Sequence, residues 1–306
     1  MRILVFGSNG LVGANLKDVL NQTSHQNFFS TRKDTNLFNY EETSNLIKDY
    51  SPDVIINCAA RVGGIVANDK NRTEFLLENL KININVLESL VELNPIKFIN
   101  LGSSCIYPLN AENPISEESI MSGKLEPTNS AYAMAKLTAI ELGNSIRKEF
   151  GHEIINLMPT NLYGKFDNFS EIDSHVIPGL IRRMHKAKTS NHDTFNVWGT
   201  GKPLREFLYA EDLAKAILFI LDNKINDELI NVGSNTEISI KDLALKVKSV
   251  VGFNGEVEFD KDMPDGNPRK LLDSSKIFDY GWSPLVGLDE GLSITYSWYL
   301  NNLNYR

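Results

Sequence analysis

Short apolar runs alternate with longer amphipathic stretches through the first half of the chain. Five runs have the length and β-branched character of buried strands, at residues 2–6, 27–30, 53–58, 96–101 and 153–158. Helical spacing of apolar residues fills several of the intervals, at residues 11–20, 72–93 and 130–150. Strands buried on both faces and separated by helices are typical of a parallel sheet covered on both sides. The pattern therefore predicts an α/β fold built on a doubly wound parallel sheet.

The regularity of this alternation weakens after Pro159. A helix over residues 211–221 and a strand over 229–232 are expected to return to the main sheet. Later helical patterns, at residues 240–251 and 287–300, fit a second and smaller unit. We expect a first domain of residues 1–163 plus about 206–232. A mostly C-terminal α/β domain, of about 164–205 plus 233–306, is expected to bind the substrate.

The first strand is followed at once by a glycine turn, Gly7-Ser8-Asn9-Gly10-Leu11-Val12-Gly13, that opens the first helix. Strand, glycine turn and helix in this order form the start of a dinucleotide-binding unit of the Rossmann type. Glycines let the backbone approach a pyrophosphate, and a helix N-terminus supplies unpaired N–H donors and positive potential. The spacing is G-x-x-G-x-x-G. A glycine turn that only packs the helix on the strand is the alternative interpretation.

The end of the second predicted strand indicates which dinucleotide is bound. A fold selective for NAD places an acidic residue near this point, where it holds the 2′-hydroxyl of the ribose. This chain has Arg32 and Lys33 instead, and a guanidinium matches a 2′-phosphate in bidentate geometry. We therefore predict NADP(H) as the cofactor. Charges that are merely solvated at the surface are the alternative.

Further contacts with the cofactor are expected where the other parallel strands end. Ala59 and Ala60 follow the third strand, and their small side chains let a cofactor pass close by. Besides the glycine turn and Arg32, the residues expected to contact the cofactor are Asn36, Leu37, Ala59, Ala60, Leu101, Gly102, Tyr132, Lys136, Pro159, Thr160, Asn161, Leu162 and His175.

A serine, a tyrosine and a lysine form the clearest candidate for chemistry. Tyr132 and Lys136 are four residues apart in a predicted helix, so they lie on one face, one turn apart. We expect the ammonium to favour the phenolate and to lower the pKa of Tyr132 from its usual value of about 10. Ser103, at the end of the fourth strand, is expected to hydrogen-bond the same substrate oxygen. Together they predict an acid/base device for a carbonyl–alcohol pair.

Composition narrows the class of protein. Of the 306 residues, 42% are hydrophobic and 23% are charged, as in an ordinary soluble globular protein. The formal net charge of −8 argues against general binding to nucleic acid or to a membrane surface. No apolar run is long enough to cross a bilayer, and no signal peptide is visible. The 2 cysteines predict a reduced, cytoplasmic setting, and we expect no metal site.

The glycine turn, Ser103 four residues before Tyr107, and the Tyr132/Lys136 pair together resemble the extended short-chain dehydrogenase/reductases. Within that superfamily the chain resembles the GDP-L-fucose synthases through motifs in collinear order: Val62–Ile65, Gly102–Pro108, Met158–Gly164, Ser174–Pro178 and Pro268–Asp273. The resemblance runs from Arg2 to about Trp298. Members of that family convert GDP-4-keto-6-deoxy-D-mannose to GDP-L-fucose. They invert C3 and C5 and then reduce the C4 ketone with NADPH.

The resemblance implies a role for each residue of the site. Cys105 is implied as the base of the inversions and His175 as the acid. Tyr132 is implied as the proton donor during reduction, with Lys136 lowering its pKa and holding the nicotinamide ribose. A thiol acts as a base only as the thiolate, so the role of Cys105 requires an environment that favours the anion. A small buried cysteine and a structural histidine are the alternatives.

Cations and a flat side chain are implied as contacts of the nucleotide sugar, which carries two phosphates and a guanine. The residues so implied are Arg183, Trp198, Arg205, Asp265 and Lys270, with Asp265 as an acceptor for ribose or base donors. Solvated surface charge is the alternative for Arg183 and Lys270. Some family members have an arginine where this chain has Asn9, so Arg32 is expected to bear more of the contact with the 2′-phosphate.

The family also implies a homodimer through paired long helices, including residues 72–93 and 131–150. Two other functions remain open. One is a related GDP-4-keto-sugar 4-reductase, acting on a deoxyhexose, dideoxyhexose or heptose, with partial or no epimerase activity. The other is a non-catalytic NADP-sensing protein on the same scaffold, which the presence of both Tyr132 and Lys136 argues against.

Overall fold

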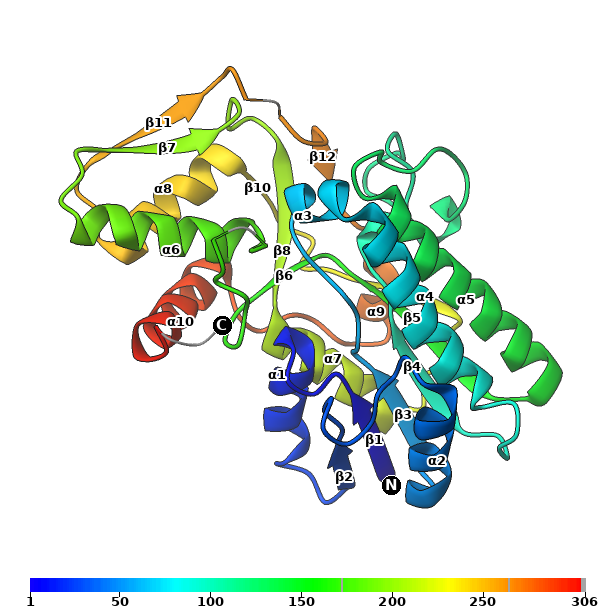
Figure 1. Ribbon diagram of the computed structural model, residues 1–306. Helices are drawn as coiled ribbons and strands as arrows, with labels where there is room; N and C mark the ends of the chain where they lie inside the picture. The colour runs from blue at the N-terminus through cyan, green and yellow to red at the C-terminus, as the bar shows by residue number, and fades with distance from the viewer. Residues whose placement is uncertain (172, 264, 304–306) are drawn as a thin grey trace.

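A parallel sheet forms the centre of the computed structural model, which describes residues 1–171, 173–263 and 265–303 (Figure 1). Within these residues the sheet has 6 strands in the order β2-β1-β3-β4-β5-β9. They are β1 (Arg2–Phe6), β2 (Gln26–Phe29), β3 (Val54–Asn57), β4 (Lys97–Leu101), β5 (Glu153–Pro159) and β9 (Leu229–Val232). Neighbouring strands are parallel throughout. The predicted doubly wound sheet is confirmed, and its strand order reverses between β1 and β3.

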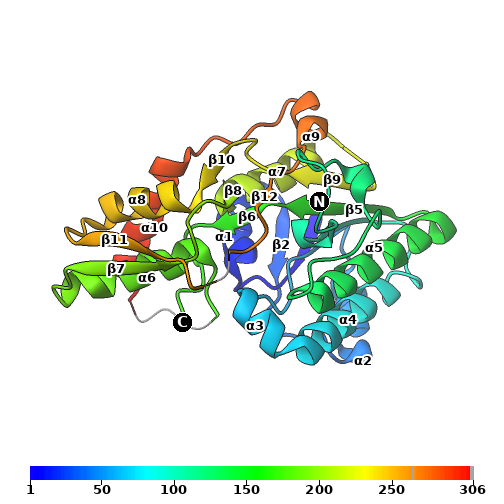
Figure 2. The same cartoon turned by 90° about the horizontal axis from the view of Figure 1, so that it is seen from above.

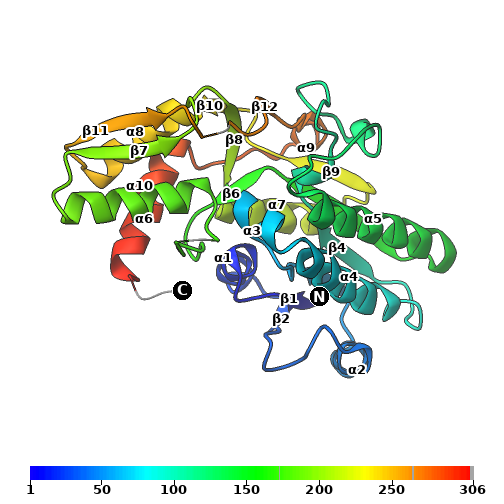
Figure 3. The same cartoon turned by 45° about the horizontal axis from the view of Figure 1, so that its top comes forward.

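Helices cover both faces of this sheet, because alternate side chains of each strand point to opposite sides. One face carries Val5, Ile56 and Ile99, which pack with α1 (Leu11–Leu20) and α7 (Ala210–Asp222). The opposite face carries Leu4, Ile55 and Phe98. It is covered by α2 (Tyr40–Tyr50), α4 (Arg72–Glu88) and α5 (Ser130–Phe150), of which α4 and α5 run side by side (Figures 1 and 3).

A second group of elements lies beyond one side of the main sheet (Figure 2). Here α6 (Val176–Thr189), α8 (Ile240–Val251) and α10 (Leu288–Asn301) enclose a separate apolar core with β7 (Thr194–Trp198) and β11 (Glu256–Asp260). A smaller sheet joins this group to the rest. Its strands are β10 (Glu237–Ser239), β8 (Leu204–Tyr209), β12 (Arg269–Lys270) and β6 (Asn161–Tyr163), with β10, β12 and β6 all pairing with β8.

The expected return of the chain to the main sheet through α7 and β9 is confirmed, since β9 pairs with β5. Residues 206–209 belong to β8 in the smaller sheet. The long helical pattern at 72–93 is shorter than predicted: α4 ends at Glu88, and Leu90 and Leu93 continue in hydrogen-bonded turns. The sequence pattern did not predict α2, α3 (Ile65–Lys70), β10, β12, α9 (Ser275–Asp279) or the short 3-10 helices η1 (Ser104–Ile106) and η2 (Glu117–Ser119).

Among the described residues, every helix is too short or too polar to serve as a membrane span.

Candidate functional site

The glycine turn leaves the start of α1 open. Gly7 has a φ of +74°, and a Cβ there would lie 2.6 Å from the backbone nitrogen of Ala59, so only glycine lets β1 and β3 end this close together. A Cβ on Gly13 would collide with the carbonyl of Gly7. Gly10 is the residue before the helix and offers no side-chain cap. Bare N–H groups at a helix N-terminus bind anions, so these residues fit the pyrophosphate of a dinucleotide.

The end of β2 presents two cations to solvent. Arg32 and Lys33 are both exposed. Asp34, an acidic residue that the sequence reasoning did not weigh, folds back onto Thr31, whose backbone N–H and hydroxyl donate to it at 2.8 and 2.7 Å. These hydrogen bonds hold the pKa of Asp34 below its ordinary value. Asp34 is therefore engaged in its own turn, and the strand end keeps the cationic character that favours a 2′-phosphate.

Most of the remaining cofactor candidates lie at the carboxyl edge of the main sheet, where a doubly wound fold binds its ligand. Ala59 and Ala60 follow β3, Leu101 and Gly102 end β4, and Pro159 to Leu162 continue β5 into β6. The hydroxyl of Ser8 is buried and donates to the carbonyl of Ser30 at 2.8 Å. This hydroxyl is therefore already engaged within the protein and is less available to a cofactor than expected. In the loop after β2, the main-chain carbonyl of Leu37 accepts from Asn85 at 2.9 Å, and the side-chain oxygen of Asn36 accepts from the N–H of Phe38.

Tyr132 and Lys136 share one buried face of α5, as predicted. The Lys136 ammonium is 2% exposed and donates to the main-chain carbonyl of Leu101 at 2.6 Å. Burial lowers the pKa of Lys136 to about 8. Burial also raises the pKa of Tyr132, the nearby Cys105 adds to the rise, and a hydrogen bond with Ser103 opposes it. The expectation of a lowered tyrosine pKa was wrong, because desolvation of the buried phenolate is the largest influence on the pKa of Tyr132.

Cys105 belongs to the same cluster as Tyr132. It lies in η1 directly after β4, where its backbone N–H donates to the Ser103 hydroxyl at 3.2 Å. Its side chain packs with Ala67, Phe75 and Tyr132. The Lys270 ammonium approaches the Cys105 sulfur at 3.7 Å. Ser103, Cys105, Tyr132 and Lys136 are thus brought together.

His175 is the residue before α6, and its side chain is exposed. Desolvation by the surrounding protein atoms nevertheless lowers the pKa of His175. The adjacent chain contacts the Gly63-Gly64 loop, since Gly64 donates its N–H to the carbonyl of Asp173 at 3.3 Å. That loop leads into α3, which packs against Tyr132 through Ala67. No hydrogen bond among the described residues joins His175 itself to Cys105 or Tyr132.

Two of the candidate substrate residues meet at the site. Arg205 of β8 and Lys270 of β12 are partners in register. Burial lowers the pKa of Arg205, while Asp265 and Cys105 oppose the shift. Asp265 is already engaged within the protein: its oxygens accept from the N–H and hydroxyl of Thr200 at 2.8 and 2.6 Å.

Arg183 and Trp198 lie farther along the second group of elements. The Arg183 guanidinium packs over the ring of Phe195, 5.3 Å from its centroid, and burial lowers the pKa of Arg183. Trp198 ends β7 and is 57% exposed. No contact among the described residues brings either side chain to Cys105 or Tyr132.

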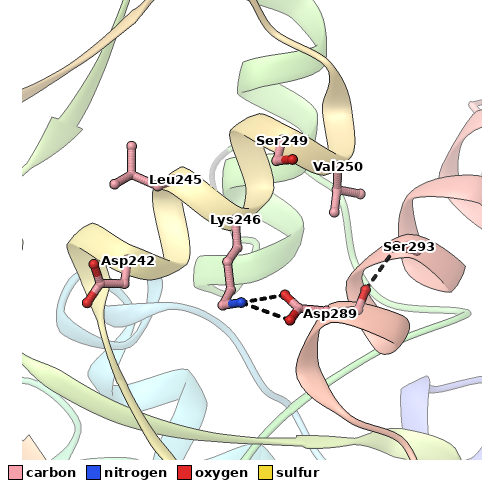
Figure 4. A pocket seen from close by; sticks show the side chains of 7 residues that line it. All are labelled: Asp242, Leu245, Lys246, Ser249, Val250, Asp289 and Ser293. Atoms are coloured by element: carbon pink, nitrogen blue, oxygen red, sulfur yellow. Dashed lines mark hydrogen bonds and ion pairs between the residues drawn. The ribbon is translucent and has the colours of Figure 1, made fainter.

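A surface groove between α8 and α10 lies apart from these residues (Figure 4). Its lining consists of Asp242, Leu245, Lys246, Ser249, Val250, Asp289 and Ser293. Lys246 crosses it to the carboxylate of Asp289, at 2.6 and 2.9 Å. None of the predicted site residues lines it, so the groove is not a part of the candidate site.

Glu206 is a supporting residue that the sequence reasoning missed. Its carboxylate is fully buried and accepts from the N–H of Asn235 at 2.7 Å and of Leu272 at 3.2 Å. Its main-chain carbonyl accepts from the side chain of Asn161 at 2.8 Å. Glu206 thereby ties β8 to the end of β5 and to the segment after β12. A carboxylate directly before the apolar run Phe207-Leu208-Tyr209 was the available signal.

Comparison with known proteins agrees with this arrangement. Residues 3–233 match the NAD dependent epimerase/dehydratase family. A probable GDP-L-fucose synthase 1 of Oryza sativa subsp. japonica is 45% identical over 304 residues, which cover 99% of this chain and 93% of the relative.

Solved structures are similar over nearly the whole chain. A GDP-L-fucose synthetase from Naegleria fowleri bound to NADP has a TM-score of 0.90 at 29% identity, covering 99% of this chain and 95% of that one. A GDP-6-OMe-4-keto-L-xylo-heptose reductase from C. jejuni has a TM-score of 0.91 at 30% identity, covering 98% of both chains. The chain therefore belongs to the NAD dependent epimerase/dehydratase family, and its resemblance to the GDP-L-fucose synthases is confirmed.

Proposed function

We propose that the protein is a GDP-L-fucose synthase. It would invert C3 and C5 of GDP-4-keto-6-deoxy-D-mannose and reduce the C4 ketone, with NADPH as the cofactor. One observation carries this proposal: Cys105 and Tyr132 pack in one cluster, with Ser103 and Lys136 beside them. The site combines a sulfur base with the groups that act on a carbonyl oxygen. A reductase that does not invert the sugar needs only the groups that act on the carbonyl oxygen, and not the sulfur base.

Inversion begins with removal of a proton from a carbon next to the C4 ketone. The Cys105 thiolate takes this proton: the C–H bond breaks, an S–H bond forms, and the electron pair moves to the C4 oxygen. Tyr132 and Ser103 stabilise that oxygen by hydrogen bonds. His175 then returns a proton to the opposite face of the carbon, and its N–H bond breaks as the new C–H bond forms.

Reduction uses the same oxygen. NADPH, when held at the open start of α1, would supply the hydride that C4 receives. Tyr132 donates its proton to the C4 oxygen, and its raised pKa keeps it in the protonated form that this step requires. Lys136 and Ser103 hold the phenol and the substrate oxygen in position.

Binding of NADPH would use the open start of α1, with Arg32 on the 2′-phosphate. The nucleotide sugar would contact Arg205, Arg183 and Trp198. These assignments rest on the exposure and charge of the residues. We also propose the two-domain division given above, with residues 1–163 and about 206–232 binding NADP and the remainder binding the sugar.

The protein would act as a cytoplasmic homodimer. Its long helices support this, since Leu77, Ile84 and Val91 are exposed apolar residues seven positions apart on or just after α4. Met134 of α5 is also exposed. Exposed apolar side chains gathered on two adjacent helices are typical of a face that a second copy covers. The 2 cysteines, both free, are consistent with a reducing compartment.

A second candidate is a GDP-4-keto-sugar 4-reductase with little or no epimerase activity. The similarity to the heptose reductase from C. jejuni favours it. Cys105 and His175 favour the full reaction, because reduction alone gives neither of them a task.

The experiment is incubation with GDP-4-keto-6-deoxy-D-mannose and NADPH, with product stereochemistry read by NMR. The wild type is expected to form the L-sugar. Cys105→Ser is expected to abolish inversion but to keep part of the hydride transfer to a ketone that is already inverted. Formation of only the D-sugar by the wild type would favour the second candidate. Unchanged formation of the L-sugar by Cys105→Ser would remove Cys105 from its proposed role.

A further inference from the structure

The contact between Lys270 and Cys105 joins residues that the sequence assigned to different tasks. Lys270 was expected to meet the nucleotide sugar, yet its ammonium nitrogen lies 3.7 Å from the Cys105 sulfur. A lysine ammonium has three N–H donors and no acceptor, so the sulfur accepts in this contact. An anionic sulfur accepts far better than a thiol, because the hydrogen bond is then charge-assisted. The contact therefore favours the thiolate.

Among the residues that the structure describes, no other group around Cys105 favours the thiolate as directly. Ser103 uses its oxygen to accept from the backbone N–H of Cys105. Tyr132, facing the sulfur from α5, would repel a thiolate if it were itself ionised. Arg205, on β8, adds positive potential, but one of its N–H groups donates to the carbonyl of Leu204 at 2.8 Å. The side chains that pack on Cys105 from α3 and α4, Ala67 and Phe75, are apolar.

The strand that carries Lys270 is fixed on both sides. Before it, Arg269 forms a bidentate ion pair with Glu237, with N–O distances of 2.7 to 3.0 Å. After it, the N–H of Leu271 donates to the side-chain oxygen of Asn113 at 2.8 Å. Because adjacent side chains of a strand point to opposite sides, Arg269 turns away while Lys270 turns to the sulfur. Lys270 is thus held in place before any substrate arrives.

We propose that Lys270 is a positioning residue that keeps Cys105 as the thiolate base of the inversion reaction. Lys270 keeps all its protons throughout. The proton taken from carbon stays on the sulfur, and the electron pair of the broken C–H bond moves to the C4 oxygen. The catalytic consequence rests on the proposed function. The effect of Lys270 on the ionisation of Cys105 does not depend on the proposed function, so it is tested separately from turnover.

The test is the pH dependence of alkylation of Cys105 by iodoacetamide, followed by peptide mass spectrometry in the whole protein. This reagent is neutral, so the lysine charge does not attract it. In Lys270→Met, we expect the half-maximal rate to move to higher pH by about one unit, which is about a tenfold loss of rate near pH 7. Lys270→Arg should restore most of the rate, since it keeps the positive charge.

Two controls accompany this measurement. Lys202→Met removes one exposed lysine near the same sheet and should leave the alkylation profile unchanged. Cys58 is an internal reference: burial raises its pKa to about 12, so it should stay unlabelled in each folded variant. Labelling of Cys58 would identify a variant that has lost its fold. If Lys270→Met is unfolded in this way, the alkylation profile of Lys270→Arg is compared with that of the wild type instead.

The inference is overturned if Lys270→Met and the wild type share one alkylation profile while both are folded. Turnover adds a second readout. Lys270→Met should lose inversion while it still transfers hydride to a ketone that needs no inversion. If the wild type reduces without inverting, the proposed function fails, yet the alkylation result still decides whether Lys270 stabilises the thiolate.

Discussion

The ammonium nitrogen of Lys136 lies 5.8 Å from the centroid of the Tyr132 ring, over its face. Its short hydrogen bond goes instead to the main-chain carbonyl of Leu101, at the end of β4. Lys136 therefore joins α5 to the strand that leads to Ser103 and Cys105. Tyr132 keeps its proton because burial raises the pKa of Tyr132. The pair is suited to donating a proton to a developing alkoxide.

Tyr132→Phe is expected to lower the rate of ketone reduction by roughly 10²- to 10⁴-fold, the usual contribution of a positioned proton donor. The ring itself should stay in place, because it packs edge-on against Phe75, with 6.5 Å between ring centroids. Binding of NADPH should consequently change little. Steady-state kinetics and NADPH fluorescence measure the two quantities. A kcat within threefold of the wild type would mean that another group donates the proton.

The charge of Lys136 should give reduction an alkaline limit. Burial lowers the pKa of Lys136 to about 8, so the ammonium is present below that pH and is lost above it. We expect kcat/KM for reduction, which reports the free enzyme, to fall as the pH rises through about 8. Lys136→Arg stays charged, and whatever activity it retains should not show this fall up to about pH 10. The same alkaline limit in both proteins would assign it to another group.

Arg32 is expected to set the preference for NADPH over NADH. A guanidinium contributes about 1.5–3 kcal/mol to a charged hydrogen bond, so Arg32→Ala should raise the KM for NADPH by about 10- to 100-fold. The KM for NADH, which has no 2′-phosphate, should change little. NADH thus serves as the control cofactor within one variant. Equal losses with both cofactors, or a preference for NADH in the wild type, would contradict the assignment.

The main sheet was predictable from sequence because its strands are buried on both faces. Runs such as Ile3–Phe6 and Val54–Ile56 show this burial directly as unbroken apolar character. Tyr132 and Lys136 were predictable as a pair because helical spacing alone puts them on one face. The hydrogen-bond partner of Lys136 was not, because Leu101 belongs to a strand whose position depends on the whole sheet. Likewise Lys270 is 165 residues from Cys105, and nothing local in either segment reveals the contact.

Asp167 is expected to make folding stability depend on pH. Its carboxyl group is buried, and one oxygen accepts from the N–H of Asn168 while the other has no partner among the described residues. Burial raises the pKa of Asp167 to about 7. Between about pH 4 and 7 the unfolded chain ionises this group while the folded chain keeps it protonated. The stabilising contribution of the protonated form is therefore lost as the pH rises through this window.

Asp167→Asn removes this titration, so its Tm relative to the wild type should rise between about pH 4 and 7 and level off above 7. The amide leaves a buried NH2 group, with two N–H donors, without a partner, which is a constant cost at every pH. The prediction therefore concerns how the difference in Tm between variant and wild type changes with pH, not its absolute size. Differential scanning calorimetry from pH 5 to 8 measures this change. Asp193→Asn, at an exposed position, is the matched control and should give a flat difference. A flat difference for Asp167→Asn as well would mean that the buried carboxyl group ionises normally.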